Sequence, residues 1–282
     1  MAASAVWRCG PHAFDLSRPL VMGILNVTPD SFSDGGEYLD PVAAFSRGLE
    51  MVEAGVGMVD VGGESTRPRA DATQVAEELA RIRPVVASLA ESDVCVSVDT
   101  RHADVAAACV AAGALVINDI GGFRDPAMRD VAAGCDAGIV VMHMLGEPGT
   151  MQEDPTYTDV VAQVGSWLVR QAQLLEFAGV AHERIMIDPG IGFGKTVEHN
   201  LELLRRLPDL ASLGYPVLVG ASRKRFLGSI TGETEPRRRV AESLAAAVWA
   251  VTHGASVVRV HDVSGTVRAV RVASAIERGV PQ

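Results

Sequence analysis

Short runs of β-branched and other apolar residues recur along this chain, with segments of helical character between them. We count about eight such runs, at residues 21–26, 57–62, 94–99, 114–119, 138–143, 184–190, 216–222 and 256–261. Their nearly continuous Val, Ile and Leu content indicates strands buried on both faces, as in a parallel sheet. The intervening segments 41–55 and 102–113 are apolar at helical spacing and end in glycine. Strand then helix, repeated about eight times, predicts an α/β protein with a (β/α)8 TIM barrel fold.

The residues at the ends of the runs favour a barrel over a doubly wound open sheet, which uses the same alternation. Polar residues stand where the runs close, among them Asn26, Asp99, Asn118, Asp188, Ser222 and His261. In a barrel these strand ends converge on one rim, where the active site lies, whereas an open sheet spreads them along a line. We therefore predict one barrel domain over residues 21–282 and an N-terminal extension over residues 1–20 that covers the barrel bottom.

Charge and cysteine usage limit the partners of such a domain. The formal net charge is -10, which argues against general nucleic-acid binding because that needs a basic face. The 4 cysteines form no C-x-x-C pair and lie in apolar stretches, as expected of thiols in a reducing compartment. Neither a signal peptide nor an apolar run of about 20 residues is visible. We expect a cytoplasmic protein with no nucleic-acid or membrane partner.

Two glycine-rich loops follow the first two runs. Residues 26–36 form a long polar loop that is a candidate lid, with an ordinary Asp/Ser/Gly turn as an equal alternative. Residues 62–68 combine glycines, two hydroxyls and the guanidinium of Arg67, a set suited to phosphate oxygens. The alternative for this second loop is a glycine turn with a solvated arginine.

Three polar side chains, Asp99, Asn118 and Asp188, end otherwise apolar strands. An unpaired carboxylate or amide is costly to bury there, so each must have a partner. For one such residue a neighbouring lysine or backbone N–H is the simpler partner. Three of them on one rim favour a planar ligand that is rich in N–H donors.

Cations gather after the seventh and eighth runs. Ser222 to Arg225 and Arg259 to His261 occupy the part of such barrels that often binds phosphate, and with Arg67 they would neutralise a diphosphate. Residues 237–239, three arginines, are interpreted instead as a solvated first turn of a helix, and His143 as a packing residue. Residues 188–196 miss the G-x-x-x-x-G-K-[ST] phosphate loop because Pro189 replaces its first glycine.

Seven motifs, in this order on these strands, resemble the dihydropteroate synthase family over residues 21 to about 270. They are MGILNVTPDSFSDGG, GGESTRP, SVDT, IND, DPGIGFGK, GASRKRFLG and RVHDV. The resemblance implies a transferase that joins 6-hydroxymethyl-7,8-dihydropterin diphosphate to p-aminobenzoate and releases pyrophosphate. It also implies Mg²⁺ as cofactor, a homodimer and inhibition by sulfonamides.

The same resemblance assigns roles to individual residues. The pterin ring would be held by Asp99, Asn118, Asp188 and Lys224, with Asp188 on the N–H edge of the aminopyrimidinone. The diphosphate would be held by Thr66, Arg67, Arg259 and His261, with Asn26 on the Mg²⁺ ion. The arylamine would lie between Phe32, Pro68 and Phe193, with Ser222, Lys224 and Arg225 near its carboxylate. Asp34 would lie near the positive charge that develops on the pterin methylene, so Asp34, Arg67 and Lys224 are the candidate catalytic residues.

Two other functions fit parts of the pattern. A pterin-dependent methyltransferase has a similar barrel but needs no diphosphate site, and a catalytically silent pterin-binding protein would have lost some of Asn26, Arg67 or Lys224, which are all present. Two positions depart from the family pattern, Arg69 in the second loop and Arg225 after Ser222-Arg223-Lys224. Neither departure removes a proposed ligand.

Overall fold

A computed structural model describes residues 6–28, 40–64, 73–146 and 149–279. Its main sheet has eight parallel strands in the order β8-β7-β6-β5-β4-β3-β10-β9. The strands are β3 (Leu20–Asn26), β4 (Met58–Gly62), β5 (Val96–Asp99), β6 (Val116–Asp119), β7 (Gly138–Met142), β8 (Ile185–Asp188), β9 (Leu218–Val219) and β10 (Val257–Val260). A parallel bridge between Ile187 and Val217 joins the two outer strands. The predicted barrel is therefore confirmed, and every strand except β3 is shorter than the apolar run that predicted it.

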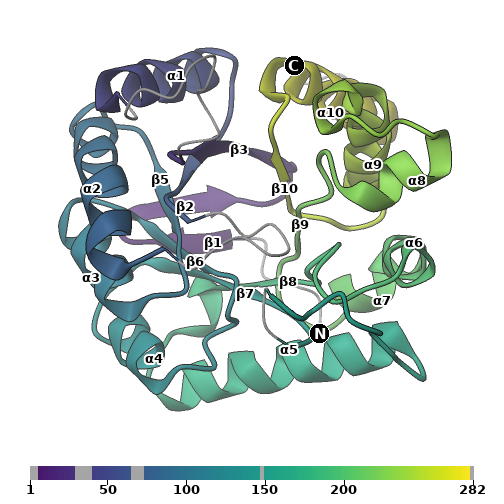
Figure 1. The fold of residues 1–282 in the computed structure, drawn as a ribbon, viewed down its shortest axis with the longest axis horizontal. Coiled ribbons are helices and arrows are strands. Elements are labelled where there is room, and N and C mark those ends of the chain that lie inside the picture. Colours follow the sequence, from purple (N-terminus) through teal and green to yellow (C-terminus); the bar gives the residue numbers. More distant parts are fainter. Residues whose placement is uncertain (1–5, 29–39, 65–72, 147–148, 280–282) are drawn as a thin grey trace.

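Helices surround the barrel on the outside (Figure 1). They are α1 (Pro41–Glu53), α2 (Val75–Glu91), α3 (Ala103–Ala111), α4 (Pro126–Ala133), α5 (Val160–Phe177), α6 (Val197–Arg205), α7 (Leu207–Ala211), α8 (Arg225–Thr231), α9 (Val240–Thr252) and α10 (Val263–Arg278), with 3-10 turns η1 (His182–Arg184) and η2 (Pro236–Arg238). Asp40 caps α1 by accepting from the Val42 N–H. Gly55 and Gly113 follow α1 and α3 with φ of 97° and 106°, values that favour glycine. Among the described residues, no helix is long and apolar enough to cross a membrane.

Side chains alternate between the inside of the barrel and the helices outside it. One inward layer is apolar and is called here the floor layer: it consists of Met22, Met58, Val116, Val140, Met186, Leu218 and Val257. Val59 and Val61 point the other way and pack with Ile82 and Val85 of α2 in the outer core. Along β4, alternation points Met58, Asp60 and Gly62 to the inside of the barrel. Asp60 therefore lies above the floor layer, nearer the carboxyl rim.

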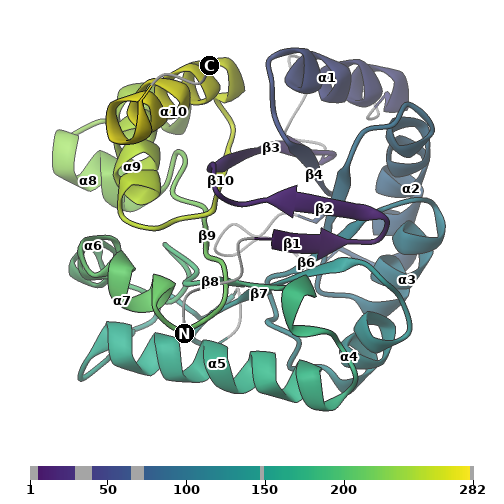
Figure 2. The same ribbon diagram turned by 180° about the vertical axis from the view of Figure 1, so that it is seen from behind.

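An antiparallel hairpin precedes the barrel, although the sequence analysis placed no strand before residue 21. It consists of β1 (Val6–Cys9) and β2 (His12–Asp15), and Figure 2 shows it lying across one end of the barrel. Trp7 is fully buried against the floor layer, and its Nε1 donates to the Arg184 carbonyl at 2.8 Å. A Cβ on Gly138 would lie 2.4 Å from Cys9 Sγ, so glycine at this position leaves room for the hairpin. Strands of four residues are too short to show in a periodicity pattern.

Candidate active site

The register of the sheet brings the predicted strand-end residues to one end of the barrel. Asn26 pairs with Gly62, Gly62 with Asp99, and Asp99 with Asn118. Further round, Asp188 pairs with Met142. The register therefore aligns Asn26, Asp99 and Asn118, and Asp188 lies two residues beyond Met186, the residue in line with Asn118. All four residues stand at the carboxyl ends of their strands, the rim that the sequence predicted.

Arg259 lies at the centre of the buried charges. Its Nε donates to Asp60 Oδ2 at 2.5 Å and its Nη2 to Asp99 Oδ2 at 2.6 Å. Burial alone would lower the pKa of Arg259, but the carboxylates of Asp60 and Asp99 hold it above its ordinary value. Burial raises the pKa of Asp99, and the positive charge of Arg259 acts in the opposite direction. The partner of Asp99, expected to be a lysine, a backbone N–H or a ligand, is thus an arginine from another strand.

Asp60 is a site residue that the sequence analysis missed. Its side chain is fully buried, and its Oδ2 also accepts a hydrogen bond from Asn118 Nδ2 at 3.1 Å. The available signal was a carboxylate in the middle of the apolar run 57–62, which is as unusual as one at a strand end. We therefore define the polar layer as Asp60, Asp99, Asn118, Asp188 and Arg259.

Asp188 completes the polar layer at the end of β8. It is 5% exposed and accepts from the Gly190 N–H at 2.7 Å through Oδ1. Burial raises its pKa to about 6, while the Gly190 hydrogen bond and the charge of Lys224 act in the opposite direction. Asp188 is thus a buried carboxylate that remains available to a donor-rich ligand.

The segment after Asp188 is a tight turn rather than a phosphate loop. Gly190, Gly192 and Gly194 all have positive φ, and a Cβ on Gly190 would lie 1.9 Å from the His143 carbonyl oxygen. Lys195 is 3% exposed, and its Nζ donates to the Phe193 carbonyl at 2.9 Å and contacts His143 Nδ1 at 3.0 Å. Burial lowers the pKa of Lys195 to about 7. The lysine therefore ties this turn to the end of β7, a role the sequence analysis did not assign.

His143 is a buried packing residue, as expected from the sequence. It is 5% exposed and lies edge-on to Trp167, with ring centroids 5.0 Å apart. Burial lowers its pKa to about 2, and the neighbouring Lys195 acts in the same direction. A neutral imidazole can accept the Lys195 hydrogen bond at Nδ1.

Lys224 and Phe193 lie together at the rim. The Lys224 Nζ stands 3.9 Å from the centroid of the Phe193 ring, within cation–π range. Burial lowers the pKa of Lys224 to about 8, and the charge of Arg259 acts in the same direction. The residues predicted to hold the pterin ring and one wall of the arylamine pocket are therefore adjacent.

The turn between β9 and α8 is held from three sides. Arg223 has a φ of 59°, its Nη2 pairs with Asp262 at 2.6 Å, and its N–H donates to Ser243 Oγ at 2.9 Å. Ser222 Oγ lies 3.1 Å from His261 Nδ1. The strained turn thus places Ser222 against the end of β10 and Lys224 over Phe193.

The interpretation of residues 237–239 as a solvated turn is wrong for Arg239. Arg237 and Arg238 are exposed, but Arg239 is 5% exposed and donates to the carbonyls of Arg223, Glu233 and Thr234. A guanidinium with five donors satisfies several loop carbonyls at once. Arg239 therefore supports the turn that carries Lys224.

Several predicted residues lie outside the described part of the chain: Phe32, Asp34, Thr66, Arg67, Pro68 and Arg69. The residues that flank the second loop are described. Glu64 pairs with Arg101 through both carboxylate oxygens, at 2.9 and 3.0 Å, and its Oε1 accepts from the Thr73 N–H at 3.2 Å. Glu64 thus links Thr73, on the far side of residues 65–72, to Arg101, which follows β5.

A barrel whose carboxylate-lined polar layer lies near the cation of Lys224 is typical of an enzyme that binds a polar ligand rich in N–H donors. Residues 22–261 match the family described as pterin binding enzyme, and the chain belongs to that family. It is 46% identical over 264 residues to the dihydropteroate synthase of Escherichia coli strain K12, covering 93% of each chain.

Solved structures agree with this membership. The dihydropteroate synthase of Burkholderia cenocepacia complexed with 7,8-dihydropteroate is 45% identical, with a TM-score of 0.89 and 98% of each chain covered. The Yersinia pestis dihydropteroate synthase with a sulfonamide drug is 42% identical, with a TM-score of 0.92, over 96% of this chain and 99% of the other.

Proposed function

We propose that this chain is a dihydropteroate synthase, which condenses 6-hydroxymethyl-7,8-dihydropterin diphosphate with p-aminobenzoate and releases pyrophosphate. The observation that carries the proposal is the polar layer: buried acceptors from β4, β5, β6 and β8 face one another beneath the cation of Lys224. A flat aminopyrimidinone offers N–H donors on one edge and a carbonyl oxygen nearby, which matches that set. The relatives described above carry the same activity in their names.

The pterin ring is assigned to Asp99, Asn118, Asp188 and Lys224. Asp188 accepts from the N–H edge of the ring, because its carboxylate is buried and, within the described part of the chain, accepts from one donor, the Gly190 N–H. Lys224 donates to the ring carbonyl from above. Charge-assisted hydrogen bonds of this kind contribute about 1.5–3 kcal/mol each.

The diphosphate is assigned to Thr66, Arg67, Arg259 and His261. Stabilising the charge on the leaving pyrophosphate is the main catalytic task, since no covalent enzyme intermediate is needed. Asp34 is assigned to the positive charge that develops on the methylene carbon. The arylamine is placed between Phe32, Pro68 and Phe193, with its carboxylate toward Ser222, Lys224 and Arg225.

Asn26 fits a Mg²⁺ site that is shared with the diphosphate. It ends β3 half-buried at the rim and offers a neutral carboxamide oxygen. Mg²⁺ takes oxygen ligands and is commonly held by one or two protein groups plus phosphate oxygens and waters. When bound, the ion supplies positive charge to the leaving group.

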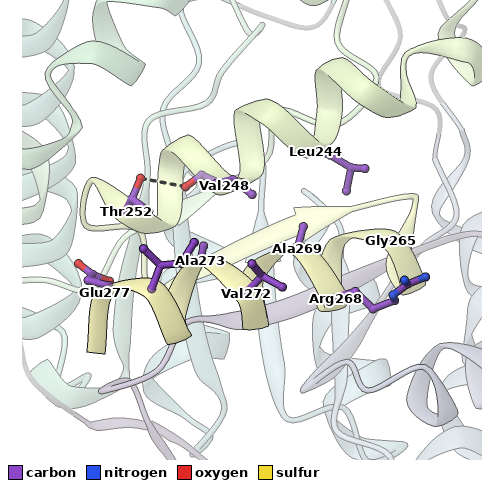
Figure 3. A pocket seen from close by; sticks show the side chains of 10 residues that line it. Leu244, Val248, Thr252, Gly265, Arg268, Ala269, Val272, Ala273 and Glu277 are labelled. Atoms are coloured by element: carbon purple, nitrogen blue, oxygen red, sulfur yellow. Dashed lines mark hydrogen bonds between the residues drawn. The ribbon is translucent and has the colours of Figure 1, made fainter. Parts of the chain in front are cut away.

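A groove between α9 and α10 supports the homodimer that the family resemblance implies. It has a volume of about 810 Å³ and is lined by Leu244, Val248, Val272 and Ile276, among others. Figure 3 shows the side chains of the two helices facing each other across it. Val272 and Ile276 are 61% and 82% exposed, and apolar surface of this kind favours a protein partner. Light scattering on Ile276→Glu against wild type tests it: a monomeric variant of a dimeric wild type supports the assignment, and a monomeric wild type removes it.

We also place the protein in the cytoplasm. Cys9, Cys95, Cys109 and Cys135 are all free thiols, which suits a reducing compartment.

The function is tested by incubating the protein with the dihydropterin diphosphate, p-aminobenzoate and Mg²⁺ and separating the products. Dihydropteroate and pyrophosphate should form in equal amounts. Lys224→Ala, folded but without the ring donor, is the matched negative control. Absence of dihydropteroate with the folded wild type would refute the proposal and return attention to methyl transfer.

A further inference from the structure

We propose that Asp60 is a positioning residue with two effects: it turns the acceptor oxygen of Asn118 toward the pterin ring, and it restrains Arg259 from the diphosphate. This inference rests on the proposed function, because the ring and the anion are the ligands of that reaction. Asp60 touches neither ligand through Oδ2, which its two protein partners occupy.

The position of Asp60 is fixed by the sheet. It lies in the middle of β4, pairs in register with Ile24 and Ser97, and is fully buried. Met58, two residues earlier, belongs to the floor layer, so alternation points Asp60 into the barrel. A carboxylate here can act only on groups inside the barrel.

Asp60 decides which end of the Asn118 amide faces the ligand. The Asn118 Nδ2 donates to Asp60 Oδ2 at 3.1 Å, and a carboxylate can only accept. The amide nitrogen must therefore face Asp60, which turns Oδ1 to the opposite side. Without that carboxylate either end of the amide could face the ring, and a donor there would oppose the ring N–H groups.

The same oxygen holds Arg259. Asp60 Oδ2 accepts from Nε, and Asp99 Oδ2 accepts from Nη2, so two nitrogens of the guanidinium are engaged inside the barrel. Burial would lower the pKa of Arg259, yet the charge of Asp60 and then of Asp99 raises it. An anion at the rim must compete with these carboxylates for the guanidinium. Asp60 thus strengthens ring binding and weakens the binding of pyrophosphate alone.

The second oxygen of Asp60 differs from Oδ2, which the two protein partners occupy. Oδ1 is buried and has no hydrogen-bond partner within the described ranges. A buried carboxylate oxygen without a donor is unfavourable, and an ordered water would satisfy it. If Asp60 only neutralised the charge of Arg259, removing its carboxylate would not change the orientation of Asn118, and ring affinity would not depend on that orientation.

The test compares two probes on one variant. Asp60→Asn keeps the shape of the side chain, and calorimetry with 6-hydroxymethylpterin and with pyrophosphate plus Mg²⁺ measures each affinity. We expect the ring affinity to fall about 10-fold or more, the factor that corresponds to one lost charge-assisted hydrogen bond. Pyrophosphate affinity should rise, because Arg259 is released, and an unchanged pyrophosphate affinity would refute the restraint on Arg259. A parallel loss of both affinities, or no change in either, overturns the proposal.

Ser97→Ala is the matched control. Ser97 pairs with Asp60 in the sheet, is equally buried, and its Oγ also has no partner within the described ranges. Within the described part of the chain Ser97 Oγ makes no hydrogen bond to Asn118 or Arg259, so both affinities should equal those of wild type. An equal loss of ring affinity in Ser97→Ala would show that any polar change in this layer disturbs binding, and would also overturn the proposal.

A double variant separates the route through Asn118. If Asp60 acts on the ring through the amide, Asp60→Asn should cost much less ring affinity in an Asn118→Ala background than in wild type. Full additivity refutes that route. Asp60→Ser replaces Asp60→Asn if the latter does not fold; if neither folds, Asp60 supports the fold and the inference fails. Dihydropteroate formation by wild type is measured first, so that a failure of the proposed function is recognised separately.

Discussion

Arg259 of β10 and Asp99 of β5 are 160 positions apart in the sequence and form a 2.6 Å ion pair inside the barrel. Two strands, β3 and β4, separate them in the sheet, so the pair spans the barrel interior rather than joining neighbours. It connects a residue proposed for the diphosphate with one proposed for the pterin ring. Ligand binding at either position must therefore rearrange or share this pair.

Arg259→Ala should lose pyrophosphate binding and also destabilise the fold. Removing one partner of a buried ion pair leaves Asp60 and Asp99 unpaired, and about 3 kcal/mol, the lower end for such pairs, is expected because the Arg259 side chain keeps 19% exposure. Urea unfolding gives the stability and calorimetry the affinity. Arg238→Ala, which removes an exposed guanidinium, is the control and should change neither. Unaltered pyrophosphate binding in folded Arg259→Ala would show that the anion site is misplaced.

Asp188→Asn should weaken pterin binding by about 2–3 kcal/mol. The substitution replaces an acceptor oxygen by a donor N–H2 group, which opposes the N–H edge of the ring. Pyrophosphate affinity should be unchanged, because Asp188 is not assigned to the anion. Calorimetry with 6-hydroxymethylpterin measures the effect. Equal ring affinity in a folded variant would remove Asp188 from the ring site.

Ring affinity should fall as the pH falls through about 6. Burial raises the pKa of Asp188 to about 6, so the contribution of this carboxyl to stability is fully present below pH about 4 and is lost as the pH rises through about 6. The ring has the opposite preference, since its N–H donors need the ionised carboxylate. Ring affinities measured between pH about 5 and about 8 should fall toward low pH in wild type. In Asp188→Asn this part of the fall should be absent, because the variant has no carboxyl group there to titrate. The same slope in both proteins would assign the titration elsewhere.

Aryl sulfonamides should inhibit by competing with p-aminobenzoate. The pocket proposed from Phe32, Pro68 and Phe193 binds a flat aniline, and a sulfonyl group presents oxygens to the donors near Ser222 and Lys224. Yersinia pestis dihydropteroate synthase has been solved with a sulfonamide drug. Pyrophosphate and Mg²⁺ should strengthen inhibition, because part of the proposed pocket belongs to the two loops that are expected to order around pyrophosphate. Noncompetitive steady-state kinetics would exclude a shared pocket.

Trp7→Ala should destabilise the barrel by about 3–5 kcal/mol while ring affinity in the folded protein stays the same. Trp7 is fully buried against the floor layer, and its loss leaves a cavity at the end of the barrel opposite the site. Phe14→Ala, which removes a partly buried neighbour with its ring centroid 6.1 Å away, should cost less. Urea unfolding of wild type, Trp7→Ala and Phe14→Ala measures the three free energies of unfolding. Equal stabilities of Trp7→Ala and wild type would show that the hairpin does not close the barrel.

Asp99, Asn118 and Asp188 could be predicted from the sequence because their signal is local. Each carries a polar group at the end of an apolar run, and parallel strands bring such ends to one rim whatever the details of packing. Asp60 lies inside an apolar run and Lys195 inside a glycine-rich turn, so neither has the strand-end signal and neither was predicted as a site residue. Period-two alternation applied to the run 57–62 would have pointed Asp60 into the barrel.

The sequence by itself determined the alternation of the barrel strands and helices from residue 21 on, and the residues at the barrel rim, since hydrophobic periodicity and strand-end chemistry act over a few positions. Only the tertiary structure decided the partners: Arg259 with Asp60 and Asp99, Lys195 with His143, and Arg239 with three loop carbonyls. A charge buried by barrel closure takes whichever partner the closed sheet brings within about 3 Å. That choice depends on shear and register around the barrel, which no local pattern encodes.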